Sequence, residues 1–454
     1  MARRIFVICK SGRLHALVQA LLSSVHQVIV GAISDVNNTK LVPPEYLYVG
    51  KTDDKEFIRR CVEEFKPDLV VIGPEEPLEV GVADLLQSLG VKCVGPLQAL
   101  AVLETSKSFT RDLMRDYNIP GRPEHRVFRS MDGVESYLKG RSSYVIKPDG
   151  LTGGKGVMVS GDHLHSVSEA VEYCRQLFAS KQPAVVIEEK LDGEEFSLQS
   201  FFDGEHIVHM VPVQDHKRAH NADRGPNTGG MGSYSCADHL LPFLKESELR
   251  EAEEINRRVG EALVDKIGRP YQGILYGGFM LTRVGLKVIE YNARFGDPEI
   301  MNVLSILEND FLDVCDALVS GGLNKIDIRF LKKATVCKYV VPEAYPGKTN
   351  GSPVIDVSKL DRFAAEEPNV RVYYGAVAEK DGKLTLTGSR AIGIVGIGNS
   401  LEEAERIAEH ATKLVDGPVY HRSDVGTAAL IDKRVRHMEK IRHAGAPRLA
   451  KLAS

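Results

Sequence analysis

The chain has 454 residues, which at about 150 residues per domain predicts roughly three domains. Hydrophobic residues make up 43% and charged residues 26%, a globular composition that excludes a disordered or fibrous chain. The net charge of −4, from 58 basic and 62 acidic residues, creates no overall positive field, so neither nucleic acid nor a membrane is an expected partner.

The cysteines and the apolar runs are typical of a cytoplasmic protein. The seven cysteines are scattered and form no CxxC motif, which favours reduced, buried thiols. The first residues show no signal-peptide pattern, and no apolar run approaches the ~20 residues that a membrane span needs. We therefore expect a soluble, cytoplasmic monomer or weak homodimer.

The first hundred residues alternate short apolar runs with amphipathic segments. This alternation predicts a parallel sheet with helices on both faces. Such sheets bind ligands beyond the carboxyl ends of their strands, where loops 10–13 and 73–77 lie. The predicted strands cover 5–9, 28–33, 68–72 and 91–94, and the predicted helices cover 15–24, 54–65 and 78–89.

A glycine-rich loop joins the predicted strands 144–147 and 157–160. Glycines at 150, 153, 154 and 156 let backbone N–H groups turn toward phosphate oxygens, and Lys147 and Lys155 add positive charge. An ordinary flexible hairpin is an equally good interpretation of the loop alone. The loop is neither a Walker A motif nor a dinucleotide fingerprint, so the functional interpretation is a hairpin lid over phosphates.

The remaining predicted elements differ in length and character. Segment 214–235 is long and polar, and we expect a functional or disordered loop without secondary structure there. From 334 onward the chain is β-rich, and its last twenty or so residues are basic and predicted to be peripheral. Predicted helices cover 105–117, 130–139, 166–179, 246–267 and 401–415; a strand covers 184–189, and hairpins cover 196–213 and 274–291.

Two groups of acidic or amide side chains lie at the ends of predicted strands. Glu188 and Glu189 end one predicted strand, and Glu195 begins the next. They are either solvated acids near a turn or part of a hinge that contacts adenine and the ribose hydroxyls; alternation does not decide whether Glu194 or Glu195 faces inward. Glu290 and Asn292 lie two apart on a strand, so their side chains share a face and offer the hard oxygen ligands that Mg²⁺ prefers.

These segments resemble the ATP-grasp ligases, and more narrowly the phosphoribosylamine–glycine ligase family. The resemblance covers about residues 1–430 and rests on motifs in the family's order: GPEEPL (73–78), LETSK (103–107), IKPDGLTGGKG (146–156), QDHKR (214–218), GPNTGGMGSY (225–234) and EYNARFGDPE (290–299). It implies an α/β ATP-grasp fold with an open parallel N-terminal domain (1–104), a linker helix (105–121), a hinged lid (122–192), a central part (193–330), a β-rich C-terminal domain (331–430) and a basic tail (431–454).

The resemblance also implies ATP-dependent ligation of glycine to 5-phosphoribosylamine in purine biosynthesis, through glycyl phosphate. Mg²⁺ or Mn²⁺ would be held by Glu290 and Asn292, and catalysis would involve Arg294, Lys155 and Asp215. The implied ATP-binding residues are Lys107, Lys147, Gly153, Gly154, Lys155, Gly156, Glu188, Glu189 and Glu195. The implied substrate-binding residues are Gly12, Arg13, Glu75, Asp215, Thr228, Gly229, Gly230, Arg294 and Asp297.

The loop after the first strand departs from the family pattern. The family usually has Gly-Gly-Arg-Glu-His-Ala-Leu there, whereas this chain has Ser11 and Leu14 in place of a glycine and the glutamate. The resemblance places the phosphate of phosphoribosylamine at this loop, and Gly12, Arg13 and the helix N-terminus are candidates to hold it. A plain strand-to-helix turn is the alternative.

Three other functions are compatible with parts of the chain. Another carboxylate–amine ligase would explain the nucleotide residues but not segments 225–232 and 294–299. A catalytically inactive nucleotide-binding regulator would be expected to lack Glu290, Asn292 or Lys155, all of which are present. A nicotinamide dehydrogenase agrees only with the N-terminal α/β pattern, because the glycine fingerprint is missing.

Overall fold

The computed structural model describes residues 2–151 and 156–444. Its N-terminal part is a parallel sheet in the order β3-β2-β1-β4-β5, because short runs of Ile, Val and Leu are buried on both faces by helices. The strands are β1 (Arg3–Ile8), β2 (Val28–Ser34), β3 (Leu47–Val49), β4 (Leu69–Ile72) and β5 (Lys92–Val94). The helices are α1 (Ser11–Leu22), α2 (Lys55–Phe65), α3 (Glu75–Glu79), α4 (Val82–Ser88) and α5 (Gln98–Thr105).

The lid is an antiparallel sheet in the order β6-β9-β7-β8, with a small apolar core of its own. Phe128, Ile146 and Ile187 from the sheet pack there against Leu138 and Cys174 from its two helices. The elements are β6 (His125–Phe128), α7 (Val134–Lys139), β7 (Val145–Pro148), β8 (Met158–Val159), α8 (Val167–Ala179) and β9 (Val185–Glu188). Helix α6 (Lys107–Asp116) precedes the lid in the chain.

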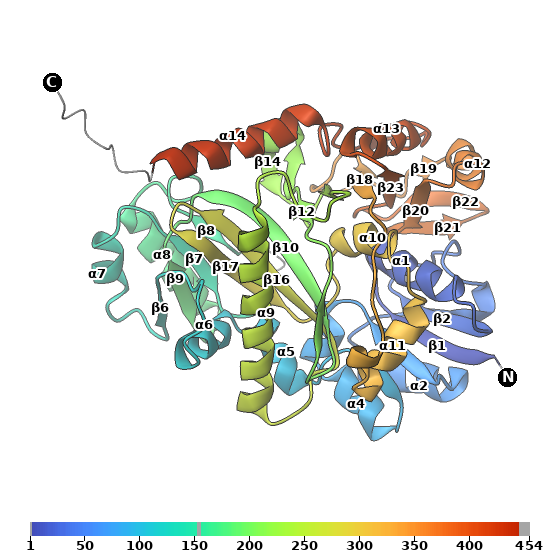
Figure 1. Ribbon diagram of the computed structural model, residues 1–454, viewed down its shortest axis with the longest axis horizontal. Helices are drawn as coiled ribbons and strands as arrows, with labels where there is room; N and C mark the ends of the chain where they lie inside the picture. The colour runs from blue at the N-terminus through green and yellow to red at the C-terminus, as the bar shows by residue number, and fades with distance from the viewer. Residues whose placement is uncertain (1, 152–155, 445–454) are drawn as a thin grey trace.

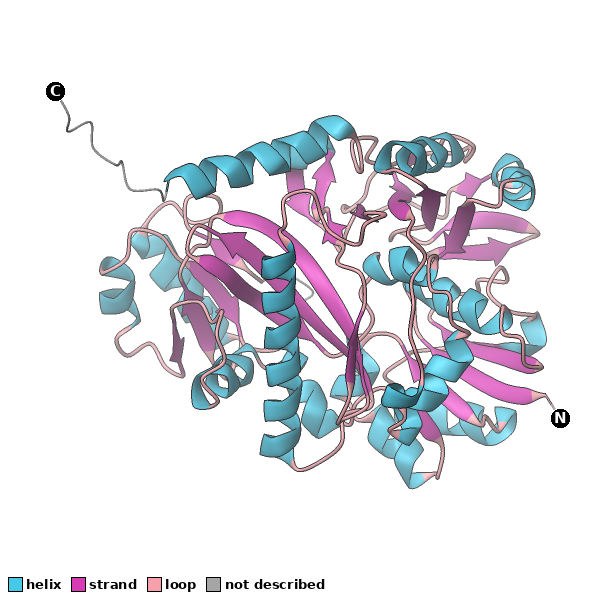
Figure 2. Cartoon of the chain, viewed as in Figure 1, coloured by secondary structure: helices cyan, strands magenta, loops and turns pink. Residues whose placement is uncertain are grey.

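The central sheet is antiparallel in the order β11-β10-β16-β17, and the long amphipathic helix α9 packs across it (Figure 2). Each strand alternates its side chains between α9 and the opposite face, which carries the candidate site. The elements are β10 (Gly193–Phe202), β11 (Ile207–His209), α9 (Glu246–Ile267), β16 (Gly273–Thr282) and β17 (Gly285–Asn292). Helices α10 (Glu299–Leu304) and α11 (Phe311–Ser320) then return to α1.

The C-terminal sheet, in the order β12-β15-β18-β23-β20, incorporates two strands from the segment that was expected to be a loop. β15 pairs antiparallel with β18, so the expected boundary between residues 330 and 331 is crossed by hydrogen bonds. The strands are β12 (Gln214–Asp215), β15 (Gly232–Ser235), β18 (Ala334–Pro342), β20 (Val370–Tyr374), β23 (Ile392–Gly398) and β24 (Val419–Tyr420), which pairs with β18.

The other elements of this region are short or peripheral to the sheet. β13 (Arg218–His220) and β14 (Arg224–Asn227) form a two-stranded ribbon within the same expected loop. A small sheet combines β19 (Val354–Ile355), β21 (Val377–Lys380) and β22 (Lys383–Leu386), and the helices are α12 (Ser358–Glu366) and α13 (Leu401–Thr412).

The prediction of a peripheral basic tail over residues 431–454 is wrong up to residue 444. The chain forms helix α14 (Ala428–Ala444) there. This helix runs from the C-terminal part across to β10 and buries Met438 completely (Figure 1). His437 Nδ1 lies 2.7 Å from Glu194 Oε1, and Arg442 Nη2 lies 2.8 Å from Glu248 Oε2. Apolar side chains and ion pairs therefore hold α14 against the central part.

Two other expected helices have different boundaries in the structure. Residues 78–89 are split between α3 and α4 at Gly81, whose φ of 78° belongs to the left-handed region that glycine tolerates. The helix expected over 105–117 is α6, but it begins only after Ser106, which ends α5 and caps α6 by accepting from the Phe109 N–H. Among the described residues, no helix combines the length and apolarity needed to cross a membrane.

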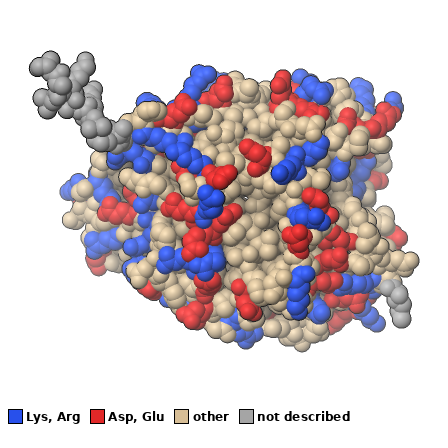
Figure 3. Space-filling view, in the orientation of Figure 1, with Lys and Arg blue, Asp and Glu red and all other residues tan. Residues whose placement is uncertain are grey.

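Acidic and basic side chains are interspersed over the face shown in Figure 3, in keeping with the small net charge of −4. The candidate site therefore has to be found from local contacts rather than from an overall field.

Candidate active site

β17 places Glu290 and Asn292 on one face of the central sheet. Glu290 is paired with Gly278 of β16, and a Cβ on that glycine would lie 3.3 Å from Glu290 Cγ. The neighbouring strand therefore leaves the carboxylate uncovered and supplies no second acid. Asn292 Oδ1 accepts a hydrogen bond of 3.3 Å from Arg294 Nη2. One carboxylate and one amide oxygen thus lie side by side on this strand.

Lysines from three separate segments of the chain influence the pKa of Glu290. Burial by itself would raise the pKa of this carboxyl, but Lys217, Lys147 and Lys107 lower it below its ordinary value. Glu290 is therefore ionised at neutral pH and surrounded by cations. An ionised carboxylate and an amide oxygen are a donor set that fits Mg²⁺ or Mn²⁺, and the lysines fit the charge of a triphosphate.

Lys147 of β7 connects the lid to the central sheet. Its Nζ lies 2.7 Å from Glu188 Oε2 and 3.1 Å from the carbonyl of Ile289, next to Glu290. Glu188 also accepts from Arg111 of α6, with Nε at 2.6 Å, and both side chains are buried. This arrangement fixes the Lys147 amine beside β17.

Lys107 lies at the start of α6, where the lid loop begins. Its Nζ donates to the carbonyl of Gly150 at 2.8 Å, and burial lowers its pKa. Asp149 accepts from the Ser108 N–H at 3.0 Å and from its hydroxyl at 2.6 Å, which ties the loop to the helix N-terminus. Of the other predicted loop residues, Gly153, Gly154 and Lys155 lie outside the described residues, and Gly156 is described, with its carbonyl accepting from Tyr173.

Glu188 and Glu189, two of the predicted ATP-binding residues, use their carboxylates in contacts within the protein. The first is bound by Arg111 and Lys147, and the second accepts from the Glu124 N–H at 2.8 Å. On β10, Glu194 points toward α14, whereas Glu195 lies 3.3 Å from Lys217 Nζ. This resolves the orientation that alternation left open, with Glu195 on the side of the lysines.

Arg294 lies between two acids. Its Nε is 3.1 Å from Glu104 Oε1 and 3.2 Å from Glu75 Oε2. Burial and the neighbouring Glu75 raise the pKa of Glu104 to about 7, although Arg294 opposes this shift. Burial by itself would raise the pKa of Glu75, but Arg294 and Arg13 lower it below its ordinary value. Arg294 thus joins the end of β17 to the N-terminal part.

The loop from 228 to 230 lies against Asp215. Gly230 has a φ of 112°, and a Cβ there would lie 2.7 Å from Asp215 Oδ1, so only glycine fits. The Thr228 hydroxyl donates to the Lys217 carbonyl at 2.8 Å and accepts from the Gly230 N–H at 3.1 Å. Burial and Glu299 raise the pKa of Asp215 well above its ordinary value. A bound ammonium group would offset this cost by stabilising the carboxylate.

Asp297 organises the surrounding loops rather than facing a free space. It accepts from Ser11 Oγ, from Tyr339 OH at 2.6 Å and from Arg390 Nη2 at 3.0 Å. Arg390 Nη1 also donates to the carbonyls of Gly229 and Gly230. Arg390 therefore connects the C-terminal domain to the loop beside Asp215.

The first-strand loop does not support the predicted phosphate contact of Gly12 and Arg13. The Arg13 side chain is buried and donates to the Phe295 carbonyl, and the Gly12 nitrogen lies 2.6 Å from where a Cβ on Gly375 would be. The backbone of the C-terminal domain thus covers this helix start. Ser11 adopts a φ of 67°, the conformation that glycine usually supplies, and its hydroxyl binds Asp297.

Sequence reasoning missed four residues of this region: Glu104, Asp149, Lys217 and Arg390. Glu104 and Asp149 stand inside the quoted motifs LETSK and IKPDGLTGGKG, which was the available indication. Arg390 lies in a segment without a motif, and its partner Asp297 is almost a hundred residues earlier in the chain.

Two antiparallel sheets that meet at a lysine, with an acid and an amide on the strand beneath it, are the arrangement of the ATP-grasp carboxylate–amine ligases. The chain belongs to the phosphoribosylglycinamide synthetase family, whose members are ATP-dependent ligases of purine biosynthesis. Family models match its N domain at residues 3–104, its ATP-grasp (A) domain at 105–300 and its C domain at 335–428. The expected resemblance and fold class are confirmed.

Individual relatives agree with the family. The chain is 47% identical over 407 residues to the phosphoribosylamine–glycine ligase of Methanocaldococcus jannaschii, covering 88% of this chain and 90% of the relative. The same enzyme of Methanocella arvoryzae is 43% identical, with 97% and 100% covered. The crystal structure of the Thermotoga maritima enzyme has a TM-score of 0.75 at 27% identity, with 93% and 99% covered.

A more distant structure shows the fold alone. The biotin carboxylase domain of Hydrogenobacter thermophilus 2-oxoglutarate carboxylase, solved with MgADP, has a TM-score of 0.72 at 14% identity and covers 98% of this chain and 99% of its own.

Proposed function

We propose that the residues around Glu290, Asn292 and Arg294 carry out the ligation of glycine to 5-phosphoribosylamine, giving glycinamide ribonucleotide, ADP and phosphate. The observation that carries this proposal is that Lys147 Nζ lies 3.1 Å from the Ile289 carbonyl, next to Glu290, while Lys107 Nζ donates to the Gly150 carbonyl at the start of the lid loop. The names of the relatives support the two substrates. The family match favours this ligase over a different carboxylate–amine ligase.

The reaction needs an activated carboxylate, because an oxide ion is not a usable leaving group. The glycine carboxylate attacks the γ-phosphorus of ATP, ADP leaves, and glycyl phosphate forms. The amine of phosphoribosylamine then attacks the acyl carbon, and phosphate departs. Phosphoryl transfer depends mainly on positioning and charge neutralisation, so the lysines and Arg294 are more important than a general base.

Each part of the site has a proposed role. Lys107 and Lys147 bind the phosphates, the lid loop with Lys155 excludes water, and Glu195 accepts from the ribose of ATP. Asp215 holds the glycine ammonium, with Thr228, Gly229 and Gly230 around it, and Arg294 neutralises the transferring phosphoryl group or the glycine carboxylate. Glu75 contacts phosphoribosylamine, while Asp297 and Arg13 hold the loops in place.

Glu290 and Asn292 would hold Mg²⁺ or Mn²⁺, which supplies charge neutralisation at the phosphates when bound. The MgADP in the Hydrogenobacter structure supports a divalent ion in this fold. The free cysteines and the metabolite substrates support a cytoplasmic location and small-molecule partners. A monomer or weak homodimer remains our proposal for the assembly.

The Glu290→Gln substitution tests the metal site. We expect the apparent affinity for Mg²⁺ or Mn²⁺ to fall by about 100-fold, because the only carboxylate donor on β17 at this face is lost. The measurement is turnover against metal concentration, together with direct Mn²⁺ titration. Glu308→Gln, at an exposed position, is the matched control. An unchanged metal requirement would argue against ligation by Glu290.

The pH dependence of glycine binding tests Asp215. Since burial and Glu299 raise the pKa of this carboxyl, its protonated form persists to a higher pH than for an ordinary aspartate. Only the carboxylate attracts the glycine ammonium, so the KM for glycine should rise as the pH falls. Asp215→Asn should raise this KM and abolish its pH dependence, and Asp238→Asn should change neither. The same pH profile in wild type and Asp215→Asn would contradict the assignment.

A further inference from the structure

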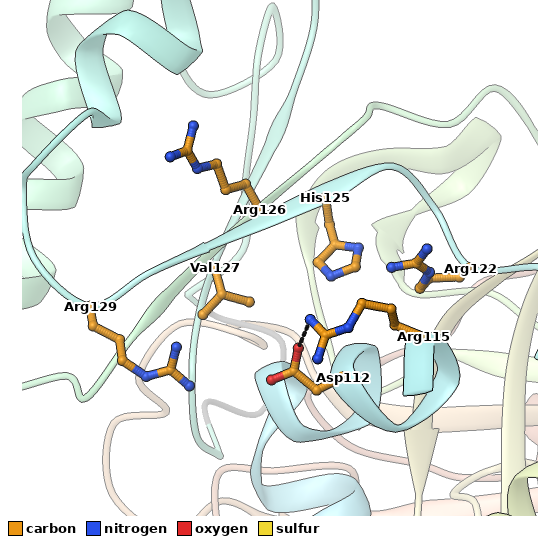
Figure 4. A pocket seen from close by; sticks show the side chains of 7 residues that line it. All are labelled: Asp112, Arg115, Arg122, His125, Arg126, Val127 and Arg129. Atoms are coloured by element: carbon orange, nitrogen blue, oxygen red, sulfur yellow. Dashed lines mark hydrogen bonds and ion pairs between the residues drawn. The ribbon is translucent and has the colours of Figure 1, made fainter. Parts of the chain in front are cut away.

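A basic pocket of about 520 Å³ lies between strand β6 of the lid and helix α6, apart from the proposed active site. Val127 is the one apolar residue of its lining; the others are Asp112, Arg115, Arg122, His125, Arg126 and Arg129. In Figure 4, the side chains of Arg122, His125 and Arg129 lie on the α6 side of β6, while Arg126 points to the other side of the strand.

The charges of this pocket are not balanced. Asp112 is paired with Arg115, with Oδ1 2.6 Å from Nη1, and Arg115 also contacts Asp116 at 2.8 Å. The side chains of Arg122 and Arg129 make no ion pair or hydrogen bond with any residue in the described parts of the chain. Two guanidinium groups are thus available, beside an imidazole and a carboxylate that is already neutralised.

The remaining arginine has a different role. The Arg126 guanidinium carbon lies 5.1 Å from the centre of the Phe128 ring and 5.6 Å from that of Tyr137. It therefore stacks on the apolar core of the lid, on the opposite face of β6. This placement separates it from the two available guanidinium groups.

We propose that this pocket binds a small anion that carries two or more phosphate groups. The planar guanidinium fork matches phosphate oxygens bidentately, and the volume is within the ~300–1,000 Å³ of small-molecule sites. Four of the seven lining residues are arginines, which favours an anionic ligand over a hydrophobic one. The site is distinct from that of ATP, whose proposed lysines Lys107 and Lys147 do not line it.

The pocket lies next to the ion pair of Arg111 on α6. Arg129 follows β6 in the lid, whereas Arg115 belongs to α6, one helical turn after Arg111. Arg111 is paired with Glu188, which also binds Lys147. An anion held by Arg122 and Arg129 would lie beside α6, whose Arg111 takes part in the ion pair that positions a proposed phosphate-binding lysine.

The stoichiometry of tripolyphosphate binding, measured by calorimetry at physiological salt, tests this proposal. We expect two sites per chain in the wild type, one at Lys147 and one in the pocket. The double variant Arg122→Ala/Arg129→Ala should lose the pocket site, with at least tenfold weaker affinity, and retain the other. Lys147→Ala should lose the site at Lys147 and retain the site in the pocket. Arg250→Ala, which removes an exposed arginine on α9, should keep both sites.

The outcomes separate the proposal from its alternatives. The proposal would be overturned if the wild type had a single tripolyphosphate site that is unchanged in the double variant. It would also be overturned if Arg250→Ala weakened binding as much as the double variant does. If the double variant is misfolded by circular dichroism, the single variant Arg129→Glu at an exposed position replaces it. In the Lys147→Ala background, displacement of the probe by ADP, but not by adenosine, would identify nucleotides rather than inorganic polyphosphate as the ligand. Ligase activity is measured separately, so failure of the proposed function would be recognised independently.

Discussion

The substitution Arg294→Ala is expected to lower kcat by about a thousandfold, the magnitude typical of an arginine that neutralises a transferring phosphoryl group. The guanidinium lies 3.1 Å from Glu104 and 3.2 Å from Glu75, so its removal also leaves two acids without their shared cation. The KM for ATP should change far less than kcat, because the lysines that bind the phosphates remain. Steady-state kinetics with both substrates saturating measure the effect.

Two further variants make this result specific. Arg294→Lys retains the charge but not the planar fork, so intermediate activity is expected. Arg283→Ala, in the exposed turn between β16 and β17, should keep wild-type turnover. Near-normal kcat in a folded Arg294→Ala enzyme would remove Arg294 from the proposed mechanism.

The substitution Glu188→Gln is expected to lower the free energy of unfolding by about 3 kcal/mol, because it leaves Arg111 and Lys147 buried without their counterion. Burial alone would raise the pKa of Glu188, but Arg111 and Lys147 lower it to about 2. The pair therefore stabilises the fold above the ordinary carboxyl pKa, and this contribution is lost as the pH falls toward 2. The decrease in the free energy of unfolding between neutral and acidic pH should therefore be smaller in Glu188→Gln than in the wild type.

Urea unfolding at neutral and acidic pH measures both effects. Glu135→Gln is the control, because Glu135 forms an exposed pair with Lys139 on the same lid and should have little influence. Equal stability of Glu188→Gln and the wild type would show that the buried cations find other partners.

Local patterns predicted much of the fold because its strands are buried on both faces. The apolar runs at 5–9, 28–33 and 68–72 correspond to β1, β2 and β4 within one or two residues. β12 and β15 were missed because they have only two to four residues; β12 pairs with β15, and β15 pairs with β18, about a hundred residues later. No periodicity can be seen in so short a strand.

Helix α14 did carry a detectable pattern. Ile431, Val435, Met438 and Ile441 recur at helical spacing, but the many basic residues between them suggested a peripheral segment. The buried face of this helix shows that charge on the outer side does not exclude packing on the inner side.

The candidate site was predictable where it depends on one strand or one loop. The alternation of a strand was enough to place Glu290 and Asn292 together. The orientation of Glu194 and Glu195, the use of Glu188 in an ion pair, and the coverage of Gly12 by Gly375 depend on partners from distant segments. Those contacts are determined by tertiary packing, which a local pattern does not contain.

Helix α14 has a consequence for how the protein is made. It is the last described helix to leave the ribosome, yet it packs on β10, which is translated more than two hundred residues earlier. Until α14 has been translated, β10 lacks this packing partner, and Glu194 lacks its ion-pair partners His437 and Arg434. A polypeptide released short of α14 would retain every proposed active-site residue and still expose one side of the strand that bears Glu195.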